Sequence, residues 1–493
     1  MKLSTLMEGL TYEIIQGDVH TDVKQLCWDS RRVKEGALFI AVRNKHVNRH
    51  DFIMDAVREG ATSIILEDDM YEVPKEVTVL RVDHTRKTMA ILANRFYHEP
   101  SKKLKLIGIT GTNGKTSTSF LIDGIMDHIG KRSGLIGTIK NTVGPKRLKT
   151  VKINPTTPDA LELQSSFAEM VEKGVEYAVM EVTSTALERD RVIGCDFNIG
   201  VFTNLSRDHL DEHGTMEAYQ AAKAKLFSMC KKAVINIDDP VGEAFASRAQ
   251  CPVITFGIMR HADFTAKDIQ YTSRGSVFTL VHNDTESKVT LSIPGEFTIY
   301  NALAAIASCY ALGLELDEII GGIGQVMFIP GRFERIPNLK DIFTIVDYAH
   351  SPDSLEQLLQ SAKKLSSGKI YVVFGCGGNR DKSKRPIMGK IAGMYADHCI
   401  LTSDNPRDED PVEIIRDIEV GIMGARCTYE KIEDRKKAIF QALSKASKGD
   451  IVIVAGKGHE NYQIRKGLSI YFNDAEVIED YFMMETDSVS VLK

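Results

Sequence analysis

The chain has 493 residues, of which 43% are hydrophobic and 26% charged, values typical of a globular protein rather than a disordered, collagen-like or coiled-coil one. Its 62 Lys and Arg against 67 Asp and Glu give a net charge of −5, which argues against a general nucleic-acid binder. No apolar run reaches the roughly 20 residues that a membrane span needs, and the eight cysteines form no Cys-x-x-Cys pair. We therefore expect a cytoplasmic protein without membrane insertion, with reduced thiols and, at ~100–200 residues per domain, about three domains.

The first 100 residues alternate short apolar strands with helical stretches, a pattern that predicts a small α/β domain. The expected elements are strands at 37–42, 62–66 and 78–82 and helices at 51–59 and 86–97. Residues 98–105 contain a proline and three lysines, so we interpret them as a linker. A first domain is therefore expected over residues 1–100.

Residues 101–330 are expected to form a central parallel α/β sheet, because strands and helices alternate again. The predicted strands lie at 104–110, 135–138, 177–182, 198–204 and 233–237. Between 253 and 294 the pattern changes to short alternating strands with Gly275 at a turn, which predicts an antiparallel excursion. A helix is expected from about 300 to 312, where Gly313 ends it.

Residues 331–493 predict a third domain, a Rossmann-like doubly wound sheet. The expected strands lie at 343–346, 370–374, 399–402 and 451–454, and the expected helices at 352–365, 385–395, 412–422 and 434–446. The sequence contains no repeat of the length that builds solenoids. The predicted fold class is therefore α/β with three domains.

A glycine-rich loop follows the first strand of the central block. Residues 108–116 read Gly-Ile-Thr-Gly-Thr-Asn-Gly-Lys-Thr, between a predicted strand and a predicted helix. In such a loop the backbone N–H groups converge on phosphate oxygens, a lysine reaches the β- and γ-phosphates and a hydroxyl holds Mg²⁺. Lys115 and Thr116 have these positions. The loop is a variant, because Ile109 stands where the general pattern has its first glycine, and a turn without ligand is the alternative.

Two further polar residues follow strands of the same block. Glu181 ends an apolar strand, and His209 comes shortly after another one. Ligands of parallel sheets bind beyond the carboxyl ends of the strands, so we expect both side chains near the phosphate loop. A solvated carboxylate at a strand end is the plain alternative for Glu181.

Lys223 occupies an unusual place in a predicted helix. At about 100° per residue, Met216, Tyr219, Leu226 and Phe227 share one face, and Lys223 falls in the middle of that apolar stripe. A lysine in this position must snorkel, pair or be modified, because a bare buried ammonium is rare.

These residues together resemble the Mur ligase family, ATP-dependent enzymes that build the peptide of the bacterial cell-wall precursor. The resemblance spans nearly the whole chain and is closest to the MurE type, which adds the third amino acid. Its motifs are 110–116, Thr156-Thr157-Pro158, 181–184, 208–213, Ala222-Lys223, 300–305, 331–334, 347–350, 404–407 and Gly456-Lys-Gly-His-Glu460. An N-terminal nucleotide-sugar domain, a central ATP domain and a C-terminal amino-acid domain are implied.

The resemblance also implies roles for individual residues. Lys115, Glu181, His209 and Lys223 correspond to the catalytic positions, and Lys223 matches a family lysine that CO₂ carbamylates. The implied Mg²⁺ ligands are Thr116, Glu181, His209 and the Lys223 carbamate. The positions implied for ATP are Gly111, Thr112, Asn113, Gly114, Lys115, Thr116, Asn301, Arg332, Asp347 and His350.

Two sets of substrate-binding positions are implied in the same way. The uridine nucleotide and the muramoyl-peptide correspond to Trp28, Ser30, Lys45, His46, Val47, Thr156, Thr157, Ser184, Arg189 and Arg191. The incoming amino acid corresponds to Arg380, Asp404, Asn405, Pro406, Arg407, Gly456 and Glu460. Members that select meso-diaminopimelate have Asp-Asn-Pro-Arg here, and a guanidinium suits the distal carboxylate that lysine lacks. Without the family context, Arg407 is simply a surface cation in a turn.

The implied reaction joins meso-2,6-diaminopimelate to UDP-N-acetylmuramoyl-L-alanyl-D-glutamate through an acyl phosphate, with ATP and Mg²⁺, by a monomeric enzyme that contributes to cell shape and division. The sequence departs from the family pattern at several positions, namely Asn44, Asn48, Arg49, Thr183, Thr185, Arg189 and Thr298. A related ligase that uses L-lysine, another amino acid or another peptide acceptor is therefore an alternative. A folylpolyglutamate synthetase-like enzyme and a catalytically silent nucleotide-sugar binder are the others.

Overall fold

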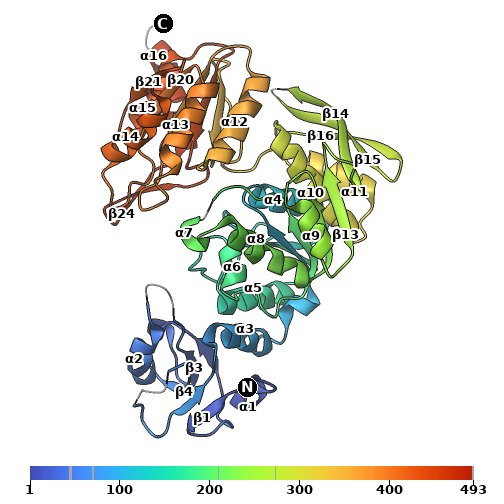
Figure 1. Cartoon of the computed structure of the whole chain (residues 1–493), viewed down its shortest axis with the longest axis vertical. Helices are drawn as coiled ribbons and strands as arrows, with labels where there is room; N and C mark the ends of the chain where they lie inside the picture. Colours follow the sequence, from blue (N-terminus) through green and yellow to red (C-terminus); the bar gives the residue numbers. More distant parts are fainter. Residues whose placement is uncertain (44–46, 69–71, 209, 273, 491–493) are drawn as a thin grey trace.

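The computed structural model consists of three α/β units stacked along the longest axis (Figure 1). It describes residues 1–43, 47–68, 72–208, 210–272 and 274–490. Each unit has its own sheet, with helices on both faces, so the predicted three-domain α/β fold class is confirmed. All eight cysteines have free thiols, as predicted.

The N-terminal unit contains a five-stranded sheet in the order β1-β5-β4-β3-β2, parallel except for β1. Alternate residues of the buried inner strand β3 enter different cores, because side chains alternate across a sheet: Phe39 packs in the layer with Ile53, and Leu38 in the layer with Leu92. The strands are β1 (Glu13–Gln16), β2 (Gln25–Cys27), β3 (Ala37–Ile40), β4 (Ala61–Leu66) and β5 (Thr78–Arg81), and the helices α1 (Leu3–Met7), α2 (Ile53–Arg58) and α3 (Thr85–Phe96).

Helix α3 joins this unit to the central one. Ala160 and Leu161, at the start of α5 (Ala160–Glu172), belong to the same apolar cluster as the buried face of α3. The expected linker after α3 forms a short 3₁₀ helix, Pro100–Lys103, in which Pro100 and Ser101 are buried. The connection is therefore a packed turn rather than an extended segment.

The central unit is an 11-stranded sheet in the order β16-β15-β14-β13-β12-β11-β6-β10-β7-β8-β9. Strands β13 to β7 run parallel, and β6 lies between β11 and β10. The strands are β6 (Lys105–Thr110), β7 (Ser133–Ile136), β8 (Asn141–Val143), β9 (Lys146–Arg147), β10 (Tyr177–Glu181), β11 (Phe197–Phe202), β12 (Cys230–Asn236), β13 (Val253–Gly257), β14 (Phe264–Thr272), β15 (Gly275–His282) and β16 (Thr285–Leu291).

The antiparallel excursion is confirmed, since β14, β15 and β16 pair antiparallel, with Gly275 at the start of β15. The helix predicted from residue 300 begins four residues earlier, at Glu296, directly after Gly295. This helix is α10 (Glu296–Ala311), and besides α5 the unit also contains α4 (Lys115–His128), α6 (Ser184–Glu188), α7 (Leu210–His213), α8 (Met216–Ala224), α9 (Gly242–Arg248) and α11 (Leu316–Gly324).

The C-terminal unit is a six-stranded sheet in the order β17-β18-β22-β19-β20-β21, parallel except for β17. Its four central strands are those predicted, whereas a separate hairpin of β23 and β24 was not expected. The strands are β17 (Glu334–Ile336), β18 (Phe343–Asp347), β19 (Ile370–Phe374), β20 (His398–Leu401), β21 (Thr428–Lys431), β22 (Ile451–Ala455), β23 (Tyr462–Arg465) and β24 (Leu468–Tyr471), and the helices α12 (Pro352–Leu365), α13 (Lys384–Tyr395), α14 (Pro411–Ile422), α15 (Arg435–Lys445) and α16 (Asp474–Ser490).

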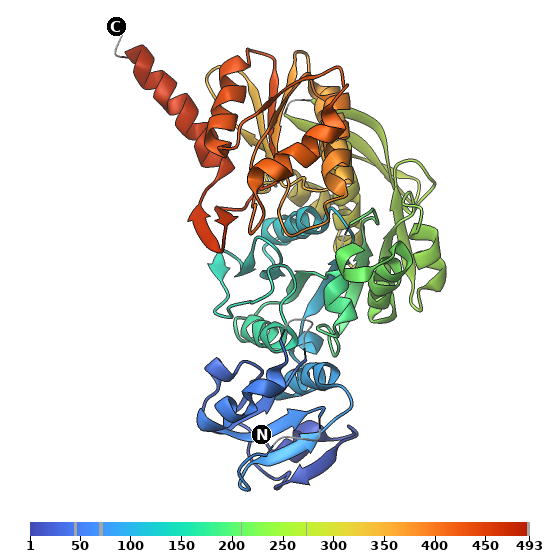
Figure 2. The same ribbon diagram turned by 60° about the vertical axis from the view of Figure 1, so that its left-hand side comes forward.

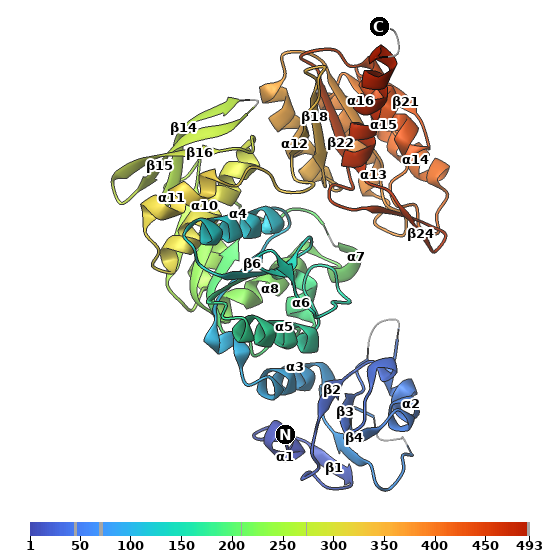
Figure 3. The ribbon, with the colours of Figure 1, turned by 180° about the vertical axis from the view of Figure 1, so that it is seen from behind.

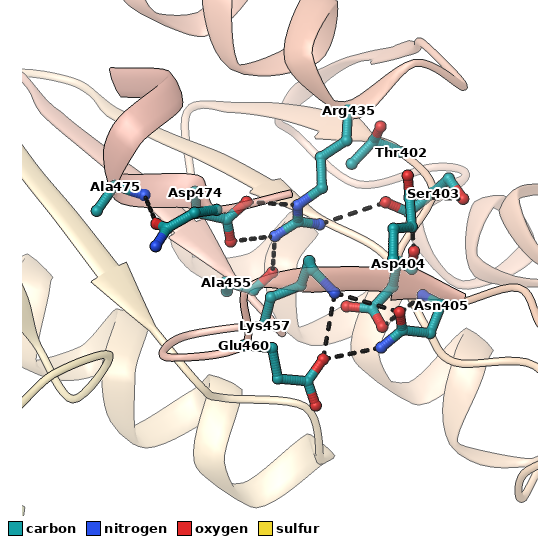
Figure 4. Close-up of polar contacts among 12 residues, drawn as sticks. Thr402, Ser403, Asp404, Asn405, Arg435, Ala455, Lys457, Glu460, Asp474 and Ala475 are labelled. Carbon is teal, nitrogen blue, oxygen red and sulfur yellow. Dashed lines mark hydrogen bonds and ion pairs between the residues drawn. The ribbon is translucent and has the colours of Figure 1, made fainter. Parts of the chain in front are cut away.

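A buried ion pair fixes the start of the last helix. The far end of α16 projects from the body of the molecule (Figure 2), while its first residue, Asp474, pairs with Arg435 at 2.7 Å, both side chains being fully buried. Arg435 also donates to the carbonyl oxygens of Ala455, at 2.9 Å, and Ser403, at 3.4 Å. The pair therefore joins α16 to the carboxyl ends of β22 and β20 (Figure 4).

Replacing this arginine is expected to destabilise the C-terminal unit strongly. Arg435→Met leaves the Asp474 carboxylate buried without a counter-charge, which costs about 3–5 kcal/mol in comparable sites. Urea unfolding of the full chain measures this change. The matched control is Lys436→Met on the next residue, whose pair with Asp480 is about half exposed and whose loss is expected to cost at most about 1 kcal/mol. Equal losses for the two variants would contradict the assignment.

Candidate active site

A cleft of about 990 Å³ lies between the carboxyl edge of the central sheet and the C-terminal unit. All the residues that line it lie between Thr112 and Glu460. Most of the site residues predicted from the sequence line this one cleft: Thr112, Asn113, Gly114, Lys115, Thr116, Thr156, Thr157, Glu181, Ser184, Arg189, Arg191, Asn301, Arg332, Asp347, His350, Arg380, Asp404, Asn405, Arg407, Gly456 and Glu460.

The glycine-rich loop connects β6 to α4, as predicted, and side chains after β11 hold it in place. Thr203 Oγ1 donates to the carbonyl oxygen of Asn113 at 2.6 Å, and the Asn113 backbone N–H donates to Asn204 Oδ1 at 2.8 Å. The Asn113 side chain reaches the other unit, where it donates to Asp353 Oδ2 at 2.8 Å. These hydrogen bonds hold the loop in a defined conformation.

Gly114 brings the loop close to helix α10. Its φ of +86° lies in the left-handed region that favours glycine. A Cβ at this position would lie 2.3 Å from Asn301 Oδ1, closer than any real contact. The structure thus places Asn301 directly against the loop, although the two residues are far apart in the sequence.

Two lysines share one acceptor beneath the loop. Lys115 Nζ donates to the Gly111 carbonyl at 2.7 Å, and Lys223 Nζ donates to the same oxygen at 2.9 Å. Lys223 is 1% exposed and lies over the Tyr219 ring at 4.4 Å, so its predicted inward orientation is confirmed. Burial, and then the neighbouring Lys115 cation, hold the pKa of Lys223 well below its usual value, while Asp208 acts in the opposite direction. Lys223 therefore loses its proton more readily than an exposed lysine does.

A carboxylate and two hydroxyl groups meet beside the loop. The Thr116 hydroxyl lies 3.0 Å from both oxygens of Glu181, which also accept from the backbone N–H of Thr138, at 2.8 Å, and from its hydroxyl, at 2.9 Å. Carboxylate and hydroxyl oxygens suit Mg²⁺. His209 lies outside the described residues; among those described, no three His, Cys, Asp or Glu side chains form a metal-binding group.

The C-terminal unit contributes a cation to this end of the cleft. The Arg332 guanidinium lies 4.3 Å from the centre of the Tyr348 ring, and its Nη2 donates to Thr116 Oγ1 at 3.4 Å. Asp347 accepts from the backbone N–H groups of Phe333, at 2.6 Å, and Ala349, at 2.7 Å. Burial raises the pKa of Asp347, and Arg332 partly offsets this effect. His350 lines the cleft beside Tyr348, with ring centres 4.6 Å apart.

Most of the residues expected to bind an amino acid follow β20 and β22, whereas Arg380 follows β19, and they lie at the other end of the cleft. Arg407 has a φ of +53° and donates from Nη1 to the Gly378 carbonyl at 2.6 Å. Its backbone pairs with the unexpected β23–β24 hairpin, through Ile464 O at 3.0 Å and Lys466 N at 2.6 Å. This hairpin lies at the end of the C-terminal unit that faces α7 (Figure 3). It therefore supports the Arg407 turn from outside.

Asp404 presents an unused acceptor in the same place. Its Oδ1 accepts from the Asn405 backbone N–H at 2.6 Å, while Oδ2 is buried and has no hydrogen-bond partner among the described residues. Gly456 has a φ of +112°, and a Cβ there would lie 2.8 Å from this Oδ2. Since an unpaired buried carboxylate oxygen is costly, the arrangement is suited to receiving an N–H donor from a ligand.

The positions expected to hold a peptide lie along β10 and α6. Thr157 Oγ1 donates to the Glu181 carbonyl at 2.9 Å, and Arg191 Nη1 donates to the Thr157 carbonyl at 3.3 Å. His213 Nε2 lies 2.9 Å from the Ser184 hydroxyl. Thr156 and Arg189 also line the cleft. Two cations and several hydroxyl groups thus face this part of the cleft, a composition suited to an anionic peptide.

The departures from the family pattern are accommodated structurally. Thr183 caps α6 by accepting from the Ala186 N–H at 3.2 Å, as a serine would. Thr185 donates to Glu212, and Thr298 donates to the Pro294 carbonyl at 3.2 Å. None of these contacts closes the cleft.

Trp28, Ser30 and Val47, which were predicted to bind the uridine nucleotide, do not line this cleft. Trp28 and Ser30 are buried in the N-terminal unit, and Val47 is 39% exposed there; Asn44, Lys45 and His46 lie outside the described residues. The Arg49 guanidinium covers the Trp28 ring at 4.5 Å, so this departure from the family pattern alters the surface around Trp28.

Three polar residues of the central and C-terminal units were not singled out from the sequence. Lys152 donates to the Gly137 carbonyl, and burial lowers its pKa to about 8. Burial, then Arg332 and other nearby cations, lower the pKa of His459 to about 3, so it is neutral. Lys457 is completely buried. The last two lie in the Gly-Lys-Gly-His-Glu motif, where a lysine directly after an apolar strand was a usable signal.

Three family models match this chain. They describe the Mur ligase family catalytic domain over residues 22–97, the Mur ligase middle domain over 109–309 and the Mur ligase glutamate ligase domain over 331–458. The chain belongs to the Mur ligase family. The resemblance inferred from its motifs is thus confirmed.

Curated relatives align with this Mur ligase over nearly the full length of both chains. It is 43% identical to UDP-N-acetylmuramoyl-L-alanyl-D-glutamate–2,6-diaminopimelate ligase 2 of Clostridium acetobutylicum, over 97% of this chain and 99% of the relative. It is 45% identical to the corresponding ligase of Bacillus cereus, over 97% and 98%. A solved structure of a UDP-N-acetylmuramoyl-L-alanyl-D-glutamate–2,6-diaminopimelate ligase matches with a TM-score of 0.71 and 34% identity, covering 99% of both chains. Within the described part of the chain, no helix has the length and apolar character needed to cross a membrane.

Proposed function

We propose that this Mur ligase adds meso-2,6-diaminopimelate to UDP-N-acetylmuramoyl-L-alanyl-D-glutamate, with conversion of ATP to ADP and phosphate. The observation that carries the proposal is the opening of a phosphate loop and of the Asp404–Arg407 turn on the same cleft. The names of its relatives at 43–45% identity support the choice of both substrates. We further propose that residues 1–100, 101–330 and 331–493 are domains for the UDP moiety, ATP and the amino acid.

On the ATP side, the loop around Gly114 and Lys115 would hold the triphosphate, with Arg332 facing its γ-phosphate and Asn301, Asp347 and His350 around the nucleoside. Thr116 and Glu181 have the donor set for Mg²⁺, and His209 would join them. The metal, when bound, would neutralise charge on the phosphates. Lys115 and Arg332 add positive charge at the same place, where the charge shifts during transfer.

Lys223 would complete the anionic part of this site after reaction with CO₂. Its amine nitrogen would bond to the carbon of CO₂ and lose a proton, which gives a carbamate. The burial of Lys223 and its lowered pKa support this step, because only the neutral amine reacts. The product carries the oxygen donors that a second Mg²⁺ requires.

The joining reaction then proceeds in two steps. The dipeptide carboxylate attacks the γ-phosphorus and releases ADP, which leaves an acyl phosphate. The amine of the incoming residue attacks the acyl carbon, loses a proton and expels phosphate. Arg189 and Arg191 would hold the anionic acceptor, and closure of the C-terminal unit over the cleft would exclude water.

Amino-acid selection would depend on the distal carboxylate and ammonium groups of the incoming amino acid. Arg407 would bind the distal carboxylate of diaminopimelate, Arg380 would add a second cation, and Glu460 would bind the distal ammonium. Lysine has no distal carboxylate, so it would leave Arg407 unpaired. Trp28, Ser30 and Val47 would hold the uridine nucleotide at the far end of the molecule, together with Lys45 and His46.

Phosphate release tests the proposed activity directly. Purified protein is incubated with ATP, Mg²⁺, bicarbonate and UDP-N-acetylmuramoyl-L-alanyl-D-glutamate, with either meso-diaminopimelate or L-lysine. We expect release with diaminopimelate and far less with lysine. Release with lysine alone would favour the lysine-adding alternative, and release with neither amino acid would overturn the proposal.

Arg407→Ala is expected to raise the KM for diaminopimelate about 10–100-fold, the usual loss for one charge-assisted contact, and to reduce discrimination against lysine. The KM for ATP should stay within a factor of about two. The matched control is Arg465→Ala on the neighbouring hairpin, whose side chain is 55% exposed and pairs with Glu433. An equal rise in the KM values for ATP and diaminopimelate would show that Arg407 mainly supports the fold.

Lys223→Met is expected to reduce kcat by about 100-fold or more, because a site for metal and phosphate loses an anionic ligand. Lys225→Met is the control, since Lys225 is half exposed and pairs with Glu188. In ¹³C NMR with labelled bicarbonate, the wild type and the Lys225 variant should show a carbamate signal that Lys223→Met lacks. Because the pKa of Lys223 is lowered, the signal should persist at neutral pH. Full activity without a carbamate would contradict this role.

A further inference from the structure

Lys457 is a buried charge beside the amino-acid end of the cleft. Its side chain is 0% exposed, and it lies between Gly456 and Glu460, which line the cleft, without lining it itself. A buried ammonium is costly unless it is paired and hydrogen-bonded. Its partners therefore indicate what it does.

Lys457 Nζ lies 3.2 Å from Glu460 Oε2 and 3.2 Å from Asn405 Oδ1 (Figure 4). Asn405 Nδ2 donates to the same Glu460 oxygen at 2.8 Å. One oxygen of Glu460 is thus held by two donors, one from the segment after β22 and one from the segment after β20. A carboxylate held in this way has a defined orientation.

The Asn405 side chain is itself fixed. Its Oδ1 also accepts from the Ile464 backbone N–H at 2.9 Å, so this oxygen receives two donors while the amide nitrogen faces Glu460. A flipped amide would place its N–H₂ group against two donors and its oxygen against a carboxylate. The three side chains therefore have one consistent hydrogen-bonding arrangement.

Charge balance leads to the same role. Asp404 and Glu460 both line this end of the cleft, and within the described part of the chain Oδ2 of Asp404 has no hydrogen-bond partner. Two carboxylates that line the same end of the cleft give it an acidic character. Lys457 pairs with Glu460 from inside the wall and offsets part of this negative charge, while the lining itself keeps the carboxylates that suit ammonium groups.

Resting on the proposed function, we propose that Lys457 is a positioning residue for the incoming diamino acid. Together with Asn405 it orients Glu460, so that this carboxylate accepts from the distal ammonium of the substrate. Lys457 does not contact the substrate, and its whole effect on selection passes through Glu460.

A set of three variants tests this proposal: Lys457→Met, Glu460→Gln and the double variant. Steady-state kinetics give the KM values for diaminopimelate and ATP, and thermal melting checks the fold. Lys457→Met and Glu460→Gln should each raise the KM for diaminopimelate about tenfold or more, with the KM for ATP within about twofold of wild type. The double variant should match Glu460→Gln within about twofold, because Lys457 has no effect without its carboxylate.

The matched control is Lys448→Met, which removes an 80% exposed lysine of the same unit and should change neither KM. An unchanged KM for diaminopimelate in Lys457→Met would overturn the proposal, as would a further tenfold loss in the double variant relative to Glu460→Gln. If Lys457→Met alone does not fold, the comparison is made between Glu460→Gln and the double variant, in which both groups are neutral. Equal KM values for diaminopimelate support the proposal, and a further tenfold rise in the double variant overturns it. A wild type inactive with diaminopimelate would instead refute the proposed function.

Discussion

The site depends on one constraint: two parallel sheets must present their carboxyl ends to the same cleft. In a parallel sheet every loop that leaves a carboxyl end lies on one edge, with the N-termini of the following helices beside it. The central sheet contributes the loop before α4 and Glu181 at the end of β10, and the C-terminal sheet contributes the turns after β20 and β22. Neither sheet alone brings a phosphate loop and the Asp404–Arg407 turn together.

Buried charges hold these loops in place, and each is stable for a local reason. Arg435 is fully buried and paired with Asp474, whose side chain is also fully buried. Lys457 is balanced by Glu460. Breaking one partner of such a pair costs far more than the pair itself contributes, so these charges specify positions rather than add stability. Through Arg435, the start of helix α16 is joined to Ala455, which directly precedes Gly456 at the amino-acid end of the cleft, although the far end of the helix projects away from the body.

Much of this arrangement follows from the sequence, because apolar strands and the phosphate loop leave clear patterns. The stripe around Lys223 correctly predicts burial, but not its acceptor, since the Gly111 carbonyl is 112 residues away in the chain. The β23–β24 hairpin was missed because its strands are largely exposed and lack an apolar pattern. Helix α10 starts earlier than predicted, because no helix-breaking residue stands between Gly295 and residue 300, so the helix continues back to Glu296. The role of Asn405 in orienting Glu460 depends on a contact 55 residues distant and could not be read locally.

The hydrogen bond from Asn113 to Asp353 has a consequence for motion between the units. It joins the phosphate loop to the first turn of α12, which belongs to the other sheet. Any anion that competes for the Asn113 amide also meets the negative charge of Asp353, so occupation of the loop and release of α12 are thermodynamically coupled. By reciprocity, whatever loosens α12 makes the loop more receptive to that anion by the same factor. This amide is one of several contacts between the two units, beside those of Arg332 with Thr116 and of Lys364 with Glu296.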